Sequence, residues 1–187
     1  MCARRPKGEG RQAAPQPCAA PDLVRRDFAA DGPDRAWFAG ITYVRTPQGW
    51  LYLAVVMDIW SRRVVGWSMS DRVAAEVADD ALGMAVARRR PPEGCVHHSD
   101  HDSLLLGRTM RETGIEPSME SIASPWDNAA MESLMGAIKA ECVHARTFEY
   151  IECFYNRVGT HSALGYLSPE EFERANWPEE ECRPMAA

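Results

Sequence analysis

The sequence contains no hydrophobic run long enough to cross a membrane. Of its 187 residues 45% are hydrophobic, yet no apolar stretch approaches the roughly 18 residues that a transmembrane helix requires. The first ten residues, MCARRPKGEG, also lack the apolar stretch of a secretory signal. We therefore expect a cytoplasmic protein.

The six cysteines do not have the spacing of a disulfide scaffold or of a zinc ribbon. They stand at positions 2, 18, 95, 142, 153 and 182, without a CxxC pair. Cys95 is followed by three histidines, His97, His98 and His101. In a strand His97 and His98 point to opposite faces, which disfavours a shared zinc site with Cys95. We expect free thiols.

The chain also lacks the excess of positive charge that is typical of proteins that coat DNA. Its net charge is −6, from 21 Lys and Arg against 27 Asp and Glu. Residues 1–30 hold six basic and three acidic groups, so the remainder is at −9. Because phosphate neutralisation supplies most non-specific affinity for DNA, this balance argues against tight DNA binding by this chain alone.

The sequence divides into a tail, a core and a second tail. Residues 1–34 are rich in Ala, Pro, Gly and Arg and are interpreted as a disordered tail or linker. Residues 35–173 carry the hydrophobic periodicity of a folded core. Residues 174–187 are acidic and are predicted to be disordered.

Within the core, the order of strands and helices predicts a mixed sheet flanked by helices, an α/β architecture. Three β-rich runs between Trp37 and Ser70 predict an antiparallel meander. The elements expected after it are a helix over 73–90, a strand over 94–100, a helix over 104–113, a strand over 115–119, a helix through MESLMGAIKAEC and a helix at FEYIECFYNRV. Arg88, Arg89 and Arg90 are expected to form a solvated last turn of the first of these helices.

Two carboxylates are placed where a metal site is often built. Asp100 ends a short strand, and Glu132 lies in the first turns of a helix. Each also has an ordinary structural explanation, because Asp favours turns and a Glu at a helix start interacts with the helix dipole. Neither residue by itself therefore indicates a function.

The longer motif blocks carry more information. These blocks are WFAGITYVRTPQGWLYLAVVMDIWSRRVVGW, HHSDHDS, SPWDNAAMESLMGAIKAE and FYNRVGTHSALGYLSPEEF. Over residues 24–173 they resemble the catalytic core of bacterial insertion-sequence transposases of the retroviral-integrase-like kind. The resemblance implies a ribonuclease H-like fold and a role in DNA integration and recombination.

In that family two Asp residues and a Glu hold divalent metal ions for hydrolysis and strand transfer at DNA phosphates. Mg²⁺ or Mn²⁺ prefers such hard oxygen ligands, and a metal pair needs several carboxylates. By motif match Asp100 and Glu132 are the second and third carboxylates. The resemblance implies DNA contacts for Lys139, Asn128, Tyr155, Asn156 and His161.

The sequence departs from the family pattern at several places. Gly40 stands where the family has its first metal-binding Asp, and Gly159 stands near the position of a usual Arg. Only 31 residues separate Asp100 from Glu132, about four fewer than the family's usual spacing, and a second short stretch is missing near residue 148. If Thr46 pairs with Trp50, Asp58 shares a face with Gly40 but lies too far away to replace it.

The resemblance and the departures together predict a transposase core with impaired chemistry. Its expected partners are transposon-end and target DNA, an intact transposase or an upstream-frame protein, and further copies of the same chain. The alternative is a non-catalytic DNA-binding or oligomerisation remnant. A host nuclease of the same fold is a less favoured interpretation, because the closing YN and HSALGY blocks resemble a transposase.

Overall fold

A computed structural model describes residues 30–46, 49–71, 74–99, 106–119, 129–141 and 147–178. Its strands are β1 (Ala36–Thr46), β2 (Gly49–Asp58), β3 (Val64–Ser70), β4 (Val96–Ser99) and β5 (Glu116–Met119). Its helices are α1 (Ala74–Arg89), α2 (Leu106–Thr113), α3 (Ala129–Glu141), the π-helix η2 (Glu149–Tyr155), the short 3₁₀ helix η3 (Ser162–Leu164) and α4 (Pro169–Asn176). No helix in these described ranges is both long and apolar enough to cross a membrane.

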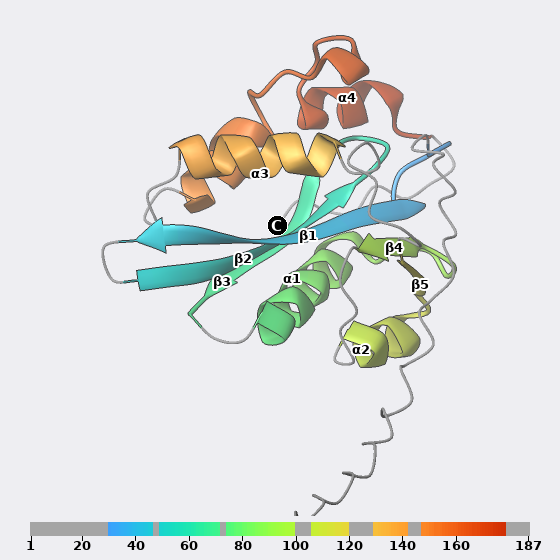
Figure 1. The fold of residues 1–187 in the computed structure, drawn as a ribbon. Helices are drawn as coiled ribbons and strands as arrows, with labels where there is room; N and C mark the ends of the chain where they lie inside the picture. The colour runs from blue at the N-terminus through green and yellow to red at the C-terminus, as the bar shows by residue number, and fades with distance from the viewer. Residues whose placement is uncertain are drawn as a thin grey trace, which may run out of the picture.

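The strands form one mixed sheet in the order β3-β2-β1-β4-β5 (Figure 1). β1, β2 and β3 pair antiparallel, which confirms the predicted meander. β4 pairs parallel with β1 and with β5. A parallel pair requires a crossover, and α1 and α2 supply the crossovers that lead into β4 and β5.

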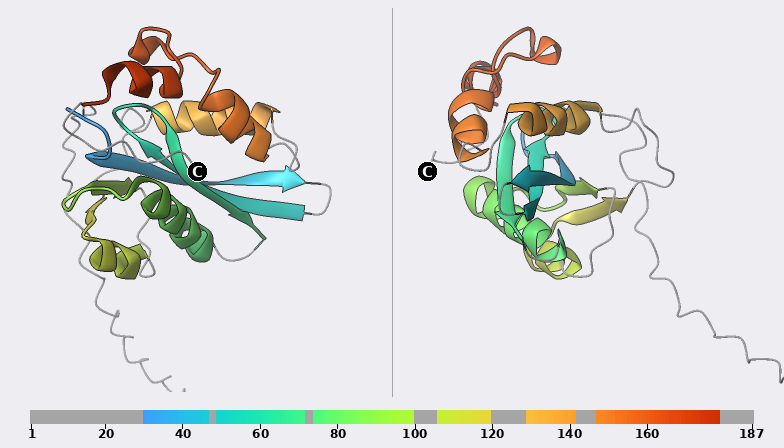
Figure 2. Two further views of the ribbon diagram at one scale, coloured as in Figure 1. Left: turned by 180° about the vertical axis from the view of Figure 1, so that it is seen from behind. Right: turned by 60° about the vertical axis from the view of Figure 1, so that its left-hand side comes forward.

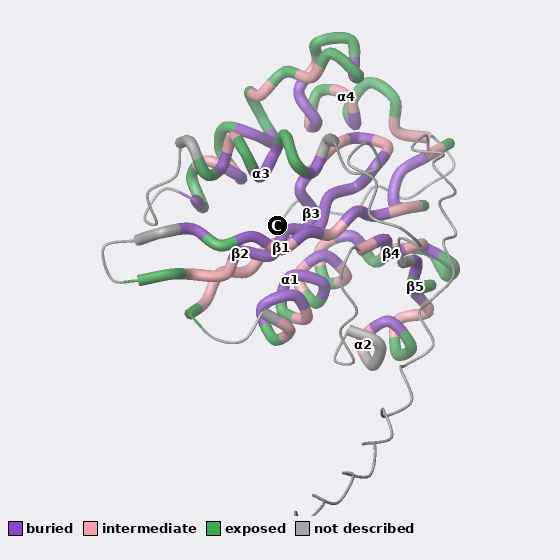
Figure 3. Tube along the Cα trace, viewed as in Figure 1, coloured by how far each residue is buried: buried purple, intermediate pink, exposed green. Residues whose placement is uncertain are grey.

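The sheet is covered on both faces. Figure 2 shows α3 and the C-terminal helices on one side of the sheet and α1 and α2 on the other. Successive β1 residues alternate between the faces, so Phe38 and Val44 pack towards α3, and Trp37 packs with the side chains of α1. The buried residues accordingly concentrate along the central strands (Figure 3). The predicted α/β sheet with flanking helices is therefore confirmed.

A glycine allows the close approach of α1 to β3. A Cβ on Gly66 would clash with the carbonyl oxygen of Ala81 and would lie 2.8 Å from the Cβ of Ala85. Only a residue without a side chain permits the helix backbone to come this near to the strand.

The C-terminal segment contains a helix that the sequence analysis did not predict. α4 begins with a capping box, in which Ser168 accepts a hydrogen bond from the Glu171 backbone and the Glu171 side chain accepts one from Ser168. Pro169 occupies the first turn, where its missing N–H costs nothing. The Ser-Pro-Glu-Glu sequence carries this signal and identifies the helix start.

The expectation that the arginines at the end of α1 are solvated is wrong for Arg89. Its side chain is buried, its Nε donates to both carboxylate oxygens of Asp34 at 2.8 and 3.0 Å, and its Nη2 lies 2.9 Å from Glu173 Oε1. The guanidinium also lies over the ring of Trp177. Arg89 thus joins the first described residues, α1 and α4 into one buried ionic cluster.

Candidate active site

Gly40 lies buried in β1, on the face that α3 covers. An ideal Cβ at this position would meet Cγ of Met131 at 2.9 Å and the terminal methyl of Met135 at 3.5 Å. The methionines of α3 therefore fill the space in which a side chain at position 40 would lie. An aspartate here requires Met131 to shift.

The end of β4 lies beside Gly40. β1 and β4 are parallel and in register, and Ala39 pairs with Ser99. Asp100 follows Ser99 in the chain but, like Asn128, lies outside the described residues. Its assignment as a metal ligand stays a prediction.

Glu132 and Lys139 are both exposed residues of α3. The helix turns its apolar residues towards the sheet and leaves these two side chains in solvent. Lys139 comes seven positions after Glu132, so the two residues share one side of the helix as expected. Glu132 is thus accessible to a ligand, and its role in metal binding stays a prediction.

The register excludes Asp58 as a substitute for the missing carboxylate. Gly40 pairs with Val55, and Asp58 pairs with Trp37. The pairing of Thr46 with Trp50 assumed from the sequence is wrong by one residue, because Thr46 pairs with Gly49. A one-residue slip exchanges the faces of a strand. Asp58 therefore lies on the face opposite to Gly40.

Asp58 instead has a structural role at the end of β2. It is fully buried and accepts hydrogen bonds from the backbone and hydroxyl of Ser61 and from the backbone of Asp34. Burial, with the nearby Asp34 charge, raises the pKa of Asp58 to about 7.

His97 and His98 point to opposite faces of the sheet, as the alternation predicted. His98 packs beside Phe38, and its Nδ1 lies 3.0 Å from the Ser118 hydroxyl. His97 is fully buried, neither ring nitrogen has a hydrogen-bond partner within the described residues, and burial lowers its pKa to about 4. Among the described residues no three His, Cys, Asp or Glu side chains cluster as a metal site.

The residues of the closing motif lie at the end of η2 and in the segment that leads from η2 to α4. Asn156 is buried, and its side-chain amide both donates to and accepts from the backbone of Val64, at 3.0 and 2.9 Å. Tyr155 is also buried, and its ring stands edge-on to His161 with 5.0 Å between the ring centres. Asn156 therefore holds the edge of β3, and the expected DNA contacts of all three residues stay predictions.

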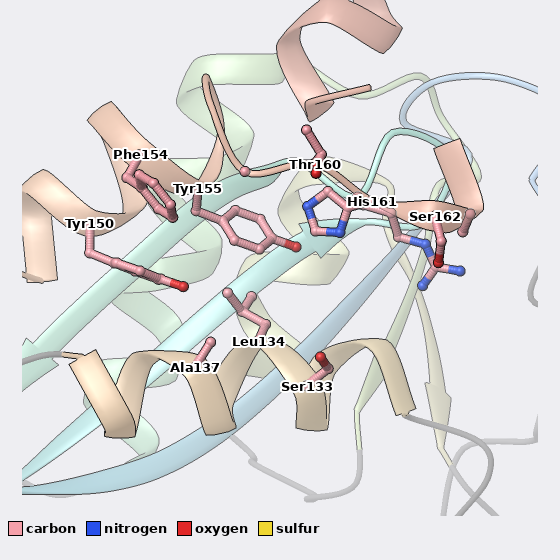
Figure 4. A pocket seen from close by; sticks show the side chains of 12 residues that line it. Ser133, Leu134, Ala137, Tyr150, Phe154, Tyr155, Thr160, His161 and Ser162 are labelled. Carbon is pink, nitrogen blue, oxygen red and sulfur yellow. The ribbon is translucent and has the colours of Figure 1, made fainter. Parts of the chain in front are cut away.

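A pocket of about 480 Å³ lies beside Tyr155 and His161, between α3, η2 and residues 159–163 (Figure 4). Arg62 also lines it. The sequence analysis did not single out Arg62. Its backbone φ of 60° is the signal of an unusual position, and this is a property of the structure.

The described residues do not fit the pair of metal ions that the family resemblance implies. Position 40 offers no oxygen ligand, and methionine side chains occupy the adjoining space. Of the three family carboxylate positions, only Glu132 presents a carboxylate within the described part of the chain.

Most of this chain is similar in sequence to known proteins. The family model described as "Integrase core domain" matches residues 30–125. The InsF transposase of insertion sequence IS3A from Escherichia coli K12 is 43% identical over 170 residues, covering 83% of this chain and 59% of that protein. A 31 kDa protein of insertion element IS600 from Shigella sonnei is 39% identical, covering 82% of this chain and 62% of its own length.

The chain thus spans less than two thirds of these relatives. Because 83% of 187 residues is about 155, about 15 of the 170 positions aligned with InsF have no residue of this chain opposite them. This difference supports the expected shortening of the core without locating it.

Solved structures show the same fold at low sequence identity. A chain of the simian T-cell lymphotropic virus intasome, in complex with PP2A regulatory subunit B56 gamma, has a TM-score of 0.67 at 15% identity and covers 93% of this chain and 64% of its own. The HTLV-2 integrase catalytic core in complex with magnesium has a TM-score of 0.61 at 13% identity, with coverages of 76% and 98%. The chain is thus similar in sequence to insertion-sequence transposases. Because the family model matches just over half of this chain, the chain belongs to the integrase core domain family.

Proposed function

We propose that the chain acts in DNA transposition as an integrase-like core whose own metal-dependent strand transfer is impaired. Gly40 carries this proposal. It stands at the motif position of the first metal-binding carboxylate, and Met131 fills the space that such a side chain would need. Mg²⁺ requires near-octahedral oxygen coordination, and a metal pair needs several carboxylates to balance its charge. Loss of one ligand leaves Asp100 and Glu132 as an incomplete set.

The similarity to a core solved with magnesium supports Mg²⁺ or Mn²⁺ as the ion that Asp100 and Glu132 would hold weakly. The similarity to InsF supports transposon ends and target DNA as the nucleic-acid partners. Lys139, exposed on the same side of α3 as Glu132, is placed to meet a phosphate. Asn128 is proposed as a further DNA contact by motif match alone.

The test is calorimetric titration of Mg²⁺ and Mn²⁺ into the wild-type chain, Gly40→Asp and Asp100→Asn. A double variant, Gly40→Asp with Met131→Ala, removes the side chain that crowds position 40. Gly83→Asp is the matched control, because it adds the same charge at an exposed position of α1 where a Cβ meets nothing within 4 Å. Circular dichroism of each variant reports whether the fold is kept.

We expect the wild type to bind Mg²⁺ and Mn²⁺ weakly and Asp100→Asn to lose this binding. The metal affinity should increase in Gly40→Asp and in the double variant, and it should stay unchanged in the Gly83→Asp control. Mn²⁺-dependent nicking of supercoiled plasmid should likewise increase in Gly40→Asp and in the double variant with Met131→Ala. Wild-type nicking in Mg²⁺ that is abolished by Glu132→Gln, and not increased by Gly40→Asp, would contradict the proposal.

The same observation at Gly40 supports a second candidate, a non-catalytic remnant that assembles with intact transposase or an upstream-frame protein. Absence of metal binding in every variant would favour this candidate. Its own test is to add the chain to an active InsF-type transposase and to measure strand transfer. Inhibition that rises with the concentration of the chain would indicate mixed assembly, and unchanged strand transfer would count against it.

A further inference from the structure

The pocket beside α3 has two chemically different ends (Figure 4). Tyr150 and Phe154, two residues of η2, form an aromatic end, and their ring centres are 5.6 Å apart. His161, Ser162 and Thr160 form a polar end. Neither Glu132 nor Gly40 lines the pocket, so it is distinct from the candidate metal site.

The electrostatics of the pocket favour an anion. None of its lining residues is acidic, although the chain as a whole carries a net charge of −6. Arg62 is its one permanently charged residue, and the charge of Arg62 acts on both Tyr155 and His161. The pocket is therefore a local positive site on an acidic protein.

Arg62 forms no ion pair with an acidic side chain of the described residues, although the charge of Asp58 acts on it. Its side chain is half-buried, and burial lowers its pKa. Within the described residues it forms no hydrogen bond or ion pair. Its φ of 60° lies in the left-handed region, which costs free energy for a residue with a Cβ. A partly desolvated guanidinium without an ion pair can bind phosphate oxygens with its planar fork of donors.

His161 presents a second unused polar group. Its Nε2 is buried and has no hydrogen-bond partner in the described part of the chain. The edge-on ring of Tyr155 and the backbone bridge between His161 and Leu167 fix its position. Burial, together with the Arg62 charge, lowers the pKa of His161, which keeps the imidazole neutral. A neutral imidazole can donate one hydrogen bond from Nε2 to an oxyanion.

We infer that this pocket binds one nucleotide of a DNA strand, with the phosphate at Arg62 and His161 and the base against the rings of Tyr150 and Phe154. The guanidinium fork matches phosphate oxygens, and aromatic side chains stack on bases. A volume of about 480 Å³ lies within the usual range of ligand pockets, roughly 300–1,000 Å³. The inference rests on the proposed function for its DNA partner, and it adds a binding site that uses none of the metal-binding positions.

The first test is calorimetric titration of the full chain with dAMP, inorganic phosphate and deoxyadenosine. The variant is Arg62→Gly, which removes the charge and suits the positive φ, so that the turn is kept. Arg90→Gly is the matched control, because Arg90 also has a positive φ, of 47°, is exposed and lies outside the pocket lining.

Saturable binding of dAMP with a Kd about ten- to a hundredfold higher in Arg62→Gly, and unchanged in Arg90→Gly, is the expected result. Phosphate and deoxyadenosine should each bind more weakly than dAMP. No saturable dAMP binding by the wild type, or equal losses in the two glycine variants, would overturn the inference.

The second test separates a DNA strand from a free nucleotide. A short single-stranded oligonucleotide should displace dAMP, and its affinity should fall by about tenfold in Phe154→Ala. Phe148→Ala serves as the control, since Phe148 is similarly exposed but does not line the pocket. Failure of the oligonucleotide to compete would refute binding of a strand. This result would leave the proposed metal chemistry untouched, so the two proposals fail separately.

Discussion

Replacing Arg89 with methionine should strongly destabilise the fold, because it removes the cation from a buried ionic cluster. Methionine keeps much of the volume of the arginine stem, so the change chiefly removes charge. In the native protein Arg89 binds both oxygens of Asp34 and lies 2.9 Å from Glu173. Without it, two buried carboxylates lose their shared counter-ion.

The magnitude follows from the burial of the partners. Burial by itself disfavours the Arg89 charge, but the carboxylates of Glu173 and Asp34 outweigh this effect and raise its pKa. Removal of one partner from a buried ion pair typically costs about 3–5 kcal/mol. For a chain of this size, that loss lowers Tm by roughly 6–20 °C. Arg63, which also donates to Glu173, holds the cost nearer the lower end.

The assay is urea denaturation followed by circular dichroism, with Arg88→Met as the control. Arg88 neighbours Arg89 in α1 and forms one ion pair, at 2.7 Å from Glu152, with a third of its side chain exposed. Its loss should cost about 0–1 kcal/mol. The difference in free energy of unfolding between Arg89→Met and Arg88→Met should become smaller in acid. Burial raises the pKa of Asp34, so its carboxyl becomes neutral there and no longer needs a counter-ion. Free energies of unfolding that differ by less than about 1 kcal/mol near neutral pH would refute the reasoning.

Three further predictions concern single positions in the core. Asn156→Ala should cost about 2–4 kcal/mol in denaturant unfolding, because the backbone groups of Val64 lose both hydrogen bonds. Gly66→Ala should lower the free energy of unfolding by more than about 1 kcal/mol, because the added Cβ overpacks against α1. Gly83→Ala, which adds a Cβ in open space on α1 itself, should instead raise Tm. Similar Tm shifts in the two variants would contradict the close approach of α1 to Gly66. The free energy of unfolding should fall as the pH rises from about 4 to 7, because the folded-state pKa of Asp58 is raised to about 7 and the folded state binds the extra proton; an equal slope in Asp58→Asn would contradict this.

The sequence by itself determined the order of elements, because local hydrophobic periodicity specifies each strand and helix in turn. The meander, α1 and α3 lie close to where their patterns placed them. The resemblance of the motifs also predicted that Gly40 stands where the family has a metal-binding Asp. These are properties of neighbouring residues, which short-range patterns record.

The tertiary structure decided what long-range packing controls. The register of β1 on β2 put Asp58 on the face opposite to Gly40, because one residue of slip exchanges the faces of a strand. Tertiary packing also buried Arg89 against Asp34 and Glu173, which lie far from it along the chain. The same packing placed Arg62 beside His161 in one pocket. No local pattern encodes such pairs, since their interaction exists only after the sheet and its covering helices have assembled.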